Sequence, residues 1–251
     1  MSPTAATPEP SPASNPLLPL TVQGLRFERN GRALIDDVGF VLHGGRIQVI
    51  LGPNGAGKSL LLRILHGLIP ADAGTIDWGG RPAALAQREL GMVLQRPVML
   101  RRSVLANLTF ALARNRVPRH LRREQAMAAL RRAELDQLAQ QPAPRLSGGE
   151  AQRLAIVRAW AQRPKVLFFD EPCVNLDPRS TLKIEQLIRE IHASGTQVIL
   201  TTHDLAQARR LAEEVLFVAN GRIQEQGSAE AFFSAPASAE AAAYLDGQLL
   251  A

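Results

Sequence analysis

A glycine-rich segment that ends in lysine and serine is the first part of this sequence that could do chemistry. It matches the pattern G-x-x-x-x-G-K-[ST] and consists of Gly52, Pro53, Asn54, Gly55, Ala56, Gly57, Lys58 and Ser59. Glycines let the backbone approach a ligand closely, so that successive N–H groups can surround phosphate oxygens. In such a loop the lysine reaches the β- and γ-phosphates and the serine hydroxyl ligates Mg²⁺. We therefore predict a nucleotide phosphate site at this segment, called the phosphate loop below.

A pair of carboxylates further along the chain supports this prediction. The apolar run 166–169 (VLFF) ends in Asp170 and Glu171, and a continuous apolar run is typical of a strand covered on both faces. Asp170 could hold Mg²⁺ through its water shell, whereas Glu171 faces the other way and is free to act as a base. An ordinary acidic strand end is the alternative, but it is weakened by the presence of Lys58. Nucleotide hydrolysis mainly needs positioned water and neutralised charge, and these groups could supply both.

The elements that must position these residues alternate between strands and helices. We predict strands over 20–27, 33–42, 46–51, 90–94, 166–169 and 198–202, and helices over 60–68, 151–161, 181–192 and 205–211. A hairpin is expected around Asn220-Gly221, between runs 215–219 and 222–226. This alternation predicts an α/β fold with a mainly parallel central sheet. The pattern turns helical over 103–138, and we expect the helical stretch between Leu94 and Val166 to form an inserted subdomain.

Composition limits the remaining possibilities. With 46% apolar residues among 251, the chain can bury a substantial core, and its single cysteine, Cys173, excludes an internal disulfide. Residues 1–19 are rich in Pro, Ser and Ala and predict a flexible extension, followed by a domain over 20–228 and a helix or frayed tail over 229–251.

No apolar run is long enough to cross a bilayer, and the N-terminus lacks the features of a signal peptide. We expect a cytosolic protein that reaches a membrane only through a partner.

Several short motifs together resemble those of ABC-type ATPases. Leu146–Glu150 (LSGGE) resembles the family's signature, and the resemblance extends from about residue 20 to 227. In order, the other matching residues are Gln95 (Q-loop), Asp170-Glu171-Pro172, Asn175-Leu176-Asp177 (D-loop) and His203 (switch histidine). The family implies a P-loop NTPase fold with a RecA-like core sheet, an antiparallel β subdomain and a helical subdomain inserted at about 96–163.

The resemblance also implies a mechanism that depends on a homodimer. Two subunits would close head to tail on two ATP molecules, each with Mg²⁺, held by Ser59, Asp170 and Gln95. Ser147, Gly148 and Gly149 of one subunit would meet the γ-phosphate held by Lys58 of the other. Glu171 would polarise the attacking water, His203 would orient it, Gln95 would sense the γ-phosphate, and Asp177 would communicate across the dimer. Without the resemblance, a surface histidine, a solvated glutamine and a helix cap would be the preferred interpretations of His203, Gln95 and Asp177.

Two positions depart from the family pattern. The aromatic residue that usually stacks on adenine falls at Arg29, and either its guanidinium plane or the ring of Phe27 could replace it. Cys173 stands in Pro-Cys-Val-Asn, where the family more often has Pro-Thr-Ala-Asn. We interpret it as a packing residue rather than a reactive thiol, because Asp170 and Glu171 disfavour a thiolate nearby.

The segment Gln95–Asn107 resembles that of tungstate-type oxyanion importers, with phosphate importers next. The family then implies separate membrane permease subunits, a substrate-binding protein outside the cell, and a peripheral position on the cytoplasmic face of the membrane. The chain ends about 25 residues after the hairpin, which we expect to be too short for the regulatory β-domain of some sugar and molybdate importers. An exporter or lipoprotein-release ATPase is the main alternative. A soluble nucleic-acid-acting ABC protein is a weaker one, since such chains carry two cassettes or a coiled-coil insertion, and no nucleic-acid partner is expected.

Positive charge is concentrated in the predicted helical subdomain. The chain carries a net charge of +6, but residues 96–163 hold 14 arginines against four acidic residues, a net charge of +10. We predict that this region docks beneath the permease at the anionic cytoplasmic leaflet. A merely solvated arginine-rich face is the alternative.

Overall fold

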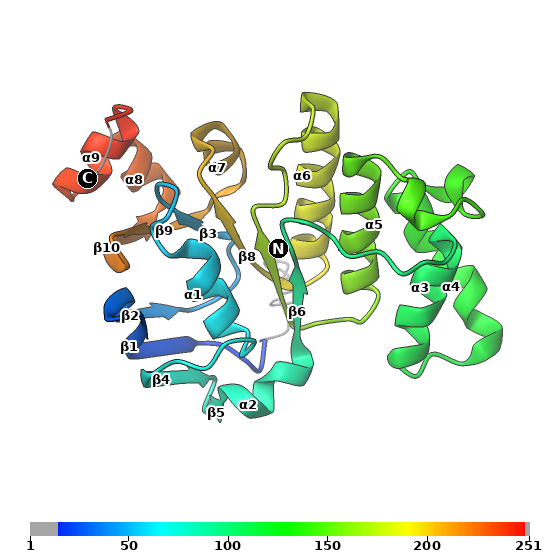
Figure 1. The fold of residues 1–251 in the computed structure, drawn as a ribbon, viewed down its shortest axis with the longest axis horizontal. Coiled ribbons are helices and arrows are strands. Elements are labelled where there is room, and N and C mark those ends of the chain that lie inside the picture. Colours follow the sequence, from blue (N-terminus) through cyan, green and yellow to red (C-terminus); the bar gives the residue numbers. More distant parts are fainter. Residues whose placement is uncertain (1–14, 249–251) are drawn as a thin grey trace, which may run out of the picture.

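The computed structural model describes residues 15–248. Its central sheet has six strands in the order β10-β9-β3-β8-β7-β6 (Figure 1). Their bounds are β3 Gln48–Leu51, β6 Leu90–Val93, β7 Val166–Asp170, β8 Gln197–Thr202, β9 Glu214–Ala219 and β10 Arg222–Ser228. All neighbouring strands are parallel except β9 and β10, which form the predicted hairpin. The prediction of an α/β fold with a mainly parallel sheet is confirmed.

A second, antiparallel sheet has the order β2-β1-β4-β5. It consists of β1 Leu20–Arg29, β2 Arg32–Leu42, β4 Ala73–Trp78 and β5 Arg81–Pro82, and the short helix α2 (Ala83–Ala86) follows it. The sequence predicted β1 and β2 but not β4, whose first three residues are exposed and which shows no apolar alternation. Helix α1 (Lys58–Leu65) lies between the two sheets, since Leu61 and Leu65 share one buried cluster with Val22 of β1 and Phe168 of β7.

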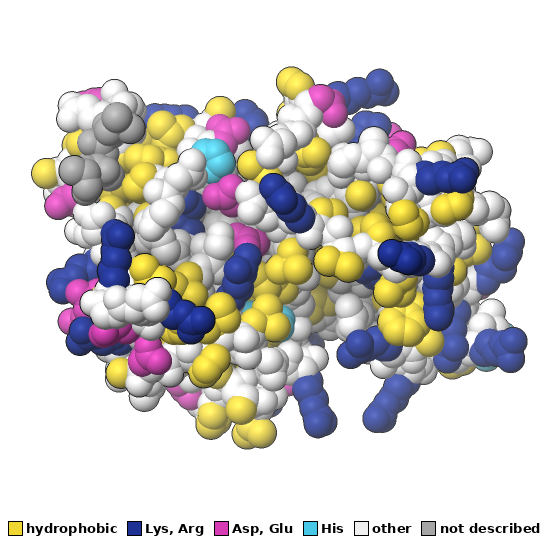
Figure 2. All heavy atoms as spheres, in the orientation of Figure 1, with side chains coloured by type: hydrophobic (Ala, Val, Ile, Leu, Met, Phe, Trp, Pro, Cys, Tyr) yellow, Lys and Arg dark blue, Asp and Glu magenta, His cyan; other side chains and the backbone are white. Residues whose placement is uncertain are grey.

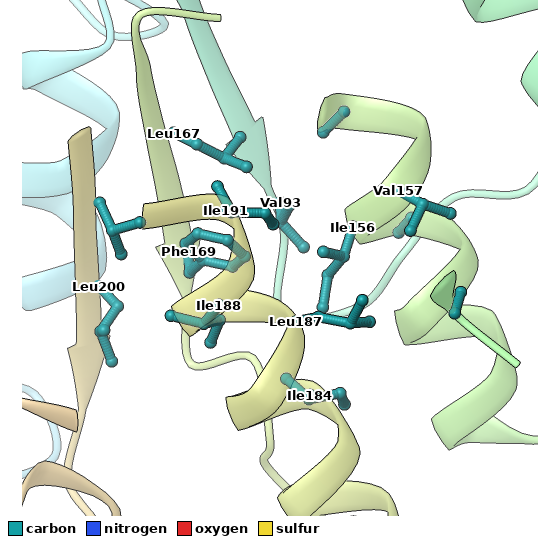
Figure 3. Packing of buried hydrophobic residues seen from close by; sticks show 14 of the residues in the cluster. Val93, Ile156, Val157, Leu167, Phe169, Ile184, Leu187, Ile188, Ile191 and Leu200 are labelled. Carbon is teal, nitrogen blue, oxygen red and sulfur yellow. The ribbon is translucent and has the colours of Figure 1, made fainter. Parts of the chain in front are cut away.

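The other face of the central sheet is covered by helices. These are α5 (Gly148–Trp160), α6 (Pro178–Ala193) and α7 (Leu205–Leu211). Figure 3 shows Phe169 and Leu200 of the sheet packed against Ile188 of α6, with Ile156 of α5 beyond it. Because neighbouring strand residues point to opposite faces, Phe168 contacts the α1 side and Phe169 the α6 side.

The predicted helical stretch 103–138 is divided. Helix α3 runs over Val104–Arg114 and α4 over Arg119–Arg132, and Pro118 stands at the N-cap of α4. Proline lacks an amide proton, so it suits a helix start but not a helix interior. Figure 1 shows α3, α4 and α5 together at one side of the molecule, where they form the helical subdomain.

Both ends of the described chain pack on the domain. Leu17 is fully buried and the Asn15 amide donates to the carbonyl oxygen of Lys165 at 2.8 Å, so the folded part begins before residue 20. The remainder of the predicted extension, 1–14, lies outside the described residues. At the other end, α8 (Ala229–Ser234) and α9 (Ala239–Leu245) bury Phe232 and Ala241, so most of the segment 229–245 is helical rather than frayed. Within residues 15–248, none of the helices has the length and apolar character that a bilayer span requires.

Candidate functional site

The phosphate loop lies between the end of β3 and the start of α1, as predicted. Two of its glycines have backbones that only glycine adopts easily: Gly52 has φ 156° and Gly57 has φ 99°. A Cβ on Gly52 would stand 2.0 Å from the carbonyl oxygen of Val218, and one on Gly57 would stand 3.0 Å from that of Leu34. The backbones of β9 and β2 therefore lie too close to the loop for a side chain, and both positions require glycine.

The Lys58 ammonium is held inside this loop. It is 4% exposed and donates to the carbonyl oxygens of Gly52 and Pro53, both at 2.8 Å, while the Glu171 carboxylate lies 3.9 Å away. Burial lowers the pKa of Lys58, and the charges of Glu171 and Asp170 oppose that shift. The Lys58 ammonium therefore stands at the first turn of α1. Its charge and the positive end of the helix dipole both favour an anion in the phosphate loop.

Asp170 is fully buried and surrounded by donors. Its carboxylate accepts from Ser59 Oγ at 2.5 Å, from Thr201 Oγ1 at 3.2 Å and from the Arg63 guanidinium at 3.2 Å. Ser59 and Asp170 were predicted to meet. Thr201 and Arg63 were not, although Arg63 follows Ser59 by one helical turn on α1 and Thr201 pairs with Asp170 across the parallel strands.

The oxygens of Ser59 and Asp170 fit Mg²⁺, which prefers hard oxygen ligands. Among residues 15–248, no group of three or more His, Cys, Asp or Glu side chains could hold a metal ion. Mg²⁺ in nucleotide sites needs no such group, because one or two protein ligands and the substrate phosphates suffice.

Glu171 leaves the strand and meets the two other predicted catalytic residues. Its φ is 45°, and its backbone N–H donates to Thr201 Oγ1 at 3.0 Å. One carboxylate oxygen lies 3.2 Å from Nδ1 of His203, and the other lies 3.4 Å from the amide nitrogen of Gln95. These residues follow β7, β8 and β6, so the carboxyl ends of three adjacent parallel strands bring them together.

A hollow of about 280 Å³ opens beside these groups, lined by Glu171, Asn175 and His203 among others. Glu171 is 12% exposed there and His203 40% exposed. A water molecule can therefore reach the Glu171 carboxylate, which a general base requires.

The signature residues lie on a different surface of the chain. Ser147 caps α5 and forms a capping box with Glu150, whose carboxylate accepts from the Ser147 backbone N–H and hydroxyl at 2.8 Å each. Ser147 and Gly148 are exposed. No hydrogen bond among the described residues joins Ser147, Gly148 or Gly149 to the phosphate loop, and α5 packs on α6 whereas α1 packs on the other face of the sheet (Figure 1). Ser147 and Gly149 therefore lie apart from Lys58 of the same chain. Their predicted contact with the γ-phosphate held by Lys58 of another subunit stays a prediction.

Three further predicted positions take local roles. Asp177 caps α6, accepting from the Ser180 backbone N–H at 2.9 Å. Hydrogen bonds from the Ser180 side chain and backbone lower the pKa of Asp177. Arg29 is exposed at the end of β1, while Phe27 is half-buried beside Ile35, which borders Gly57. The stacking of Arg29 or Phe27 on adenine stays a prediction.

Cys173 is partly buried, and desolvation is the main cause that raises its pKa to about 12. Glu185 and Asp204 add to the shift, rather than Asp170 and Glu171 as the sequence suggested, because the side chain points to the α6–α7 side. Its interpretation as a packing residue agrees with this position.

Comparison with known proteins places the chain in a family. Residues 35–174 match the family model described as ABC transporter. A phosphate import ATP-binding protein of Natronomonas pharaonis is 36% identical over 92% of this chain and 87% of its own length. A tungstate uptake system ATP-binding protein of Peptoclostridium acidaminophilum is 33% identical over 85% of this chain and 99% of its own.

Solved structures agree. The dimeric structure of an ATP-binding cassette in a post-hydrolysis state, bound to ADP and Pi, superposes with a TM-score of 0.75 at 25% identity and covers 83% of this chain and 98% of that one. An ATP-binding subunit of an ABC transporter superposes with a TM-score of 0.76 at 26% identity, over 85% of this chain and 91% of that one. This chain is therefore an ATPase of the ABC transporter family.

Proposed function

We propose that this chain is the ATP-hydrolysing subunit of a membrane importer for a small oxyanion, with tungstate favoured over molybdate and phosphate. The observation that carries the proposal is the convergence of Lys58, Glu171 and His203 at the ends of the parallel strands. Relatives named as import ATP-binding proteins for phosphate, tungstate and molybdenum support the transport class.

The site residues divide the reaction between them. Lys58 and the backbone N–H groups of the phosphate loop bind the β- and γ-phosphates and offset their charge. His203 orients the attacking water toward the γ-phosphate and Glu171 accepts its proton. The water oxygen bonds to the γ-phosphorus while the bond from that phosphorus to the bridging β-phosphate oxygen breaks, which leaves ADP and inorganic phosphate. Ser59, Asp170 and Gln95 would hold Mg²⁺, which supplies charge neutralisation at the phosphates.

A homodimer completes this site. Ser147, Gly148 and Gly149 are displayed at the start of α5, away from the phosphate loop of their own chain. Two head-to-tail subunits would bring this helix start, with its positive dipole, to the γ-phosphate of the partner subunit. Asp177, at the start of α6, would lie at the contact between the two subunits. The subunits would bind permease partners on the cytoplasmic face of the membrane, fed by a substrate-binding protein.

Glu171→Gln tests the assignment of the base. The variant keeps the shape of the side chain but cannot take a proton, so we expect steady hydrolysis to stop while an ATP-bound dimer accumulates. Phosphate release and light scattering after size-exclusion chromatography measure the two effects. Lys58→Ala is the matched control, because it should lose ATP binding or hydrolysis and therefore form no such dimer. Normal turnover in the Glu171→Gln variant would overturn the assignment.

The transported anion is tested on another subunit, since the ATPase does not contact it. The substrate-binding protein of the same transporter should retain tungsten when purified, as measured by mass spectrometry of its bound elements. Molybdenum or phosphorus there would replace tungstate by molybdate or phosphate. An export permease as the partner would contradict import.

A further inference from the structure

The only tyrosine of the chain, Tyr244, joins the C-terminal helix to two parts of the ATPase site. Its hydroxyl donates to the carbonyl oxygen of His203 at 3.0 Å and lies 3.4 Å from that of Gly52. These carbonyls belong to the switch residue and to the first glycine of the phosphate loop. None of the roles proposed for the site residues explains this contact.

Tyr244 is held in place from two directions. Its ring packs on Phe217 of β9 with ring centres 5.2 Å apart. The start of α9 is fixed by the Glu225 carboxylate, which accepts from the backbone N–H groups of Ala237 and Ser238 at 3.0 and 2.9 Å and from the Ser238 hydroxyl at 2.9 Å. The hydroxyl therefore stands at a position that the fold determines, as a positioning group requires.

The two acceptors connect directly to groups that act in the reaction. The Gly52 carbonyl also accepts from Lys58 Nζ, and the side chain of His203 contacts the Glu171 carboxylate. When Lys58 turns toward the phosphates of ATP, the Gly52 carbonyl loses that donor. The Tyr244 hydroxyl lies 3.4 Å from that carbonyl oxygen and 3.0 Å from that of His203. Its single hydrogen can be shared between the two acceptors, which holds the His203 backbone close to the loop.

We propose that Tyr244 is a positioning residue for ATP hydrolysis, whose hydroxyl ties the backbone of His203 to the phosphate loop and so keeps the imidazole against Glu171. The inference rests on the proposed role of His203. Tyr244 contacts neither nucleotide nor water in this role; it acts through His203. Burial raises the pKa of Tyr244 to about 12, so the phenol stays protonated and able to donate.

Tyr244→Phe tests the proposal in the full chain, because it removes the hydroxyl but keeps the ring against Phe217. We expect kcat for ATP to fall about tenfold, in line with the loss of one hydrogen bond at the transition state, while KM and the thermal midpoint stay close to wild type. Glu240→Gln is the matched control, an exposed change on α9 that should leave all three unchanged. Unchanged kcat in Tyr244→Phe would overturn the proposal.

A double-mutant cycle separates action through His203 from a general effect. In a His203→Ala background, followed with radiolabelled ATP, Tyr244→Phe should have no further effect on residual hydrolysis. The same tenfold loss in that background would overturn the proposal. If Tyr244→Phe has no effect but His203→Ala is inactive, only the role of Tyr244 fails. If His203→Ala itself retains wild-type kcat, the proposed role of His203 fails and that of Tyr244 with it.

The single tyrosine also provides a spectroscopic signature. Labelling with [¹³Cζ]tyrosine gives one resonance from the described part of the chain, and we expect it to shift when ATP binds to the Glu171→Gln variant. In Lys58→Ala the Gly52 carbonyl lacks its lysine donor without any nucleotide, so we expect the resonance of that variant to be displaced already before ATP is added. A resonance that ignores ATP in the Glu171→Gln variant would show a merely structural contact and overturn the proposal.

Discussion

At the scale of single residues, two adjacent carboxylates have different surroundings because the strand ends between them. Asp170 is the last residue of β7 and is fully buried among three donors. Glu171 turns out of the strand with φ 45° and is open to the hollow beside His203. A buried, fully bonded carboxylate suits a metal ligand, while an accessible one suits a base.

Cys173 shows how burial sets reactivity at one residue. Its pKa of about 12 leaves roughly a thousandfold less thiolate at pH 8 than an ordinary cysteine has. We expect native protein to react with iodoacetamide at least that much more slowly than a free thiol, as measured by mass spectrometry. The same protein unfolded in guanidinium chloride serves as the control and should label rapidly. Rapid labelling of the native protein would contradict this account.

At the scale of elements, the signature glycines differ in what surrounds them. A Cβ on Gly149 would stand 2.4 Å from Ser180 Oγ and 2.8 Å from Ser180 Cβ, because α5 and α6 meet there. A Cβ on Gly148 would make only an ordinary contact, 3.4 Å from Leu176. Gly149 is thus required by helix packing within the chain, in addition to its proposed contact with the nucleotide of the partner subunit.

Gly149→Ala should therefore destabilise the fold even without nucleotide. We expect a loss of about 1–3 kcal/mol, typical of overpacking, seen as a lower midpoint of thermal unfolding. Gly148→Ala is the matched control at the next position and should leave the midpoint nearly unchanged. Equal midpoints for the two variants would show that Ser180 moves aside easily and that the packing argument is wrong.

At the scale of the whole molecule, the excess of positive over negative charge lies in residues 96–163, which carry 14 arginines and four acidic residues. Figure 2 shows Lys and Arg side chains around the part of the molecule that Figure 1 assigns to α3 and α4. The Arg122 guanidinium donates to the carbonyl oxygen of Val117 at 2.7 Å, so it also fixes the turn before α4. Arg119 and Arg123 are exposed and carry the surface charge without such a bond in the described chain.

Charge reversal at Arg119 and Arg123 tests whether this surface favours an anionic membrane. Each arginine near such a surface contributes about 1 kcal/mol, so wild type should cosediment with vesicles containing phosphatidylglycerol more than with neutral ones. The Arg119→Glu, Arg123→Glu variant should lose this preference. Arg32→Glu with Arg88→Glu is the control, since both are exposed outside the helical subdomain. If both variants lose the preference for anionic vesicles equally, or if neither loses it, a solvated arginine-rich face is the correct interpretation.

Sequence order was enough to predict the features that depend on neighbouring residues. The phosphate loop, the apolar strand before Asp170 and the hairpin at Asn220-Gly221 are local, because turn geometry and strand periodicity act over a few residues. Strand β4 has no such periodicity and was missed. The division of 103–138 into two helices could have been predicted from Pro118, which cannot continue a helix.

The sequence by itself determined the chemistry of the site, because Lys58, Glu171 and His203 are identified by their types and by the motifs around them. Only the tertiary structure decided which groups surround them. Thr201 reaches Asp170 through the pairing of β7 with β8, and Tyr244 reaches His203 because α8 and α9 fold back on β9. Contacts between residues far apart in the chain depend on strand order and helix packing, which no local pattern encodes. For the same reason, the separation of Ser147 from Lys58 became visible only once α5 and α1 were seen to pack on opposite faces of one sheet.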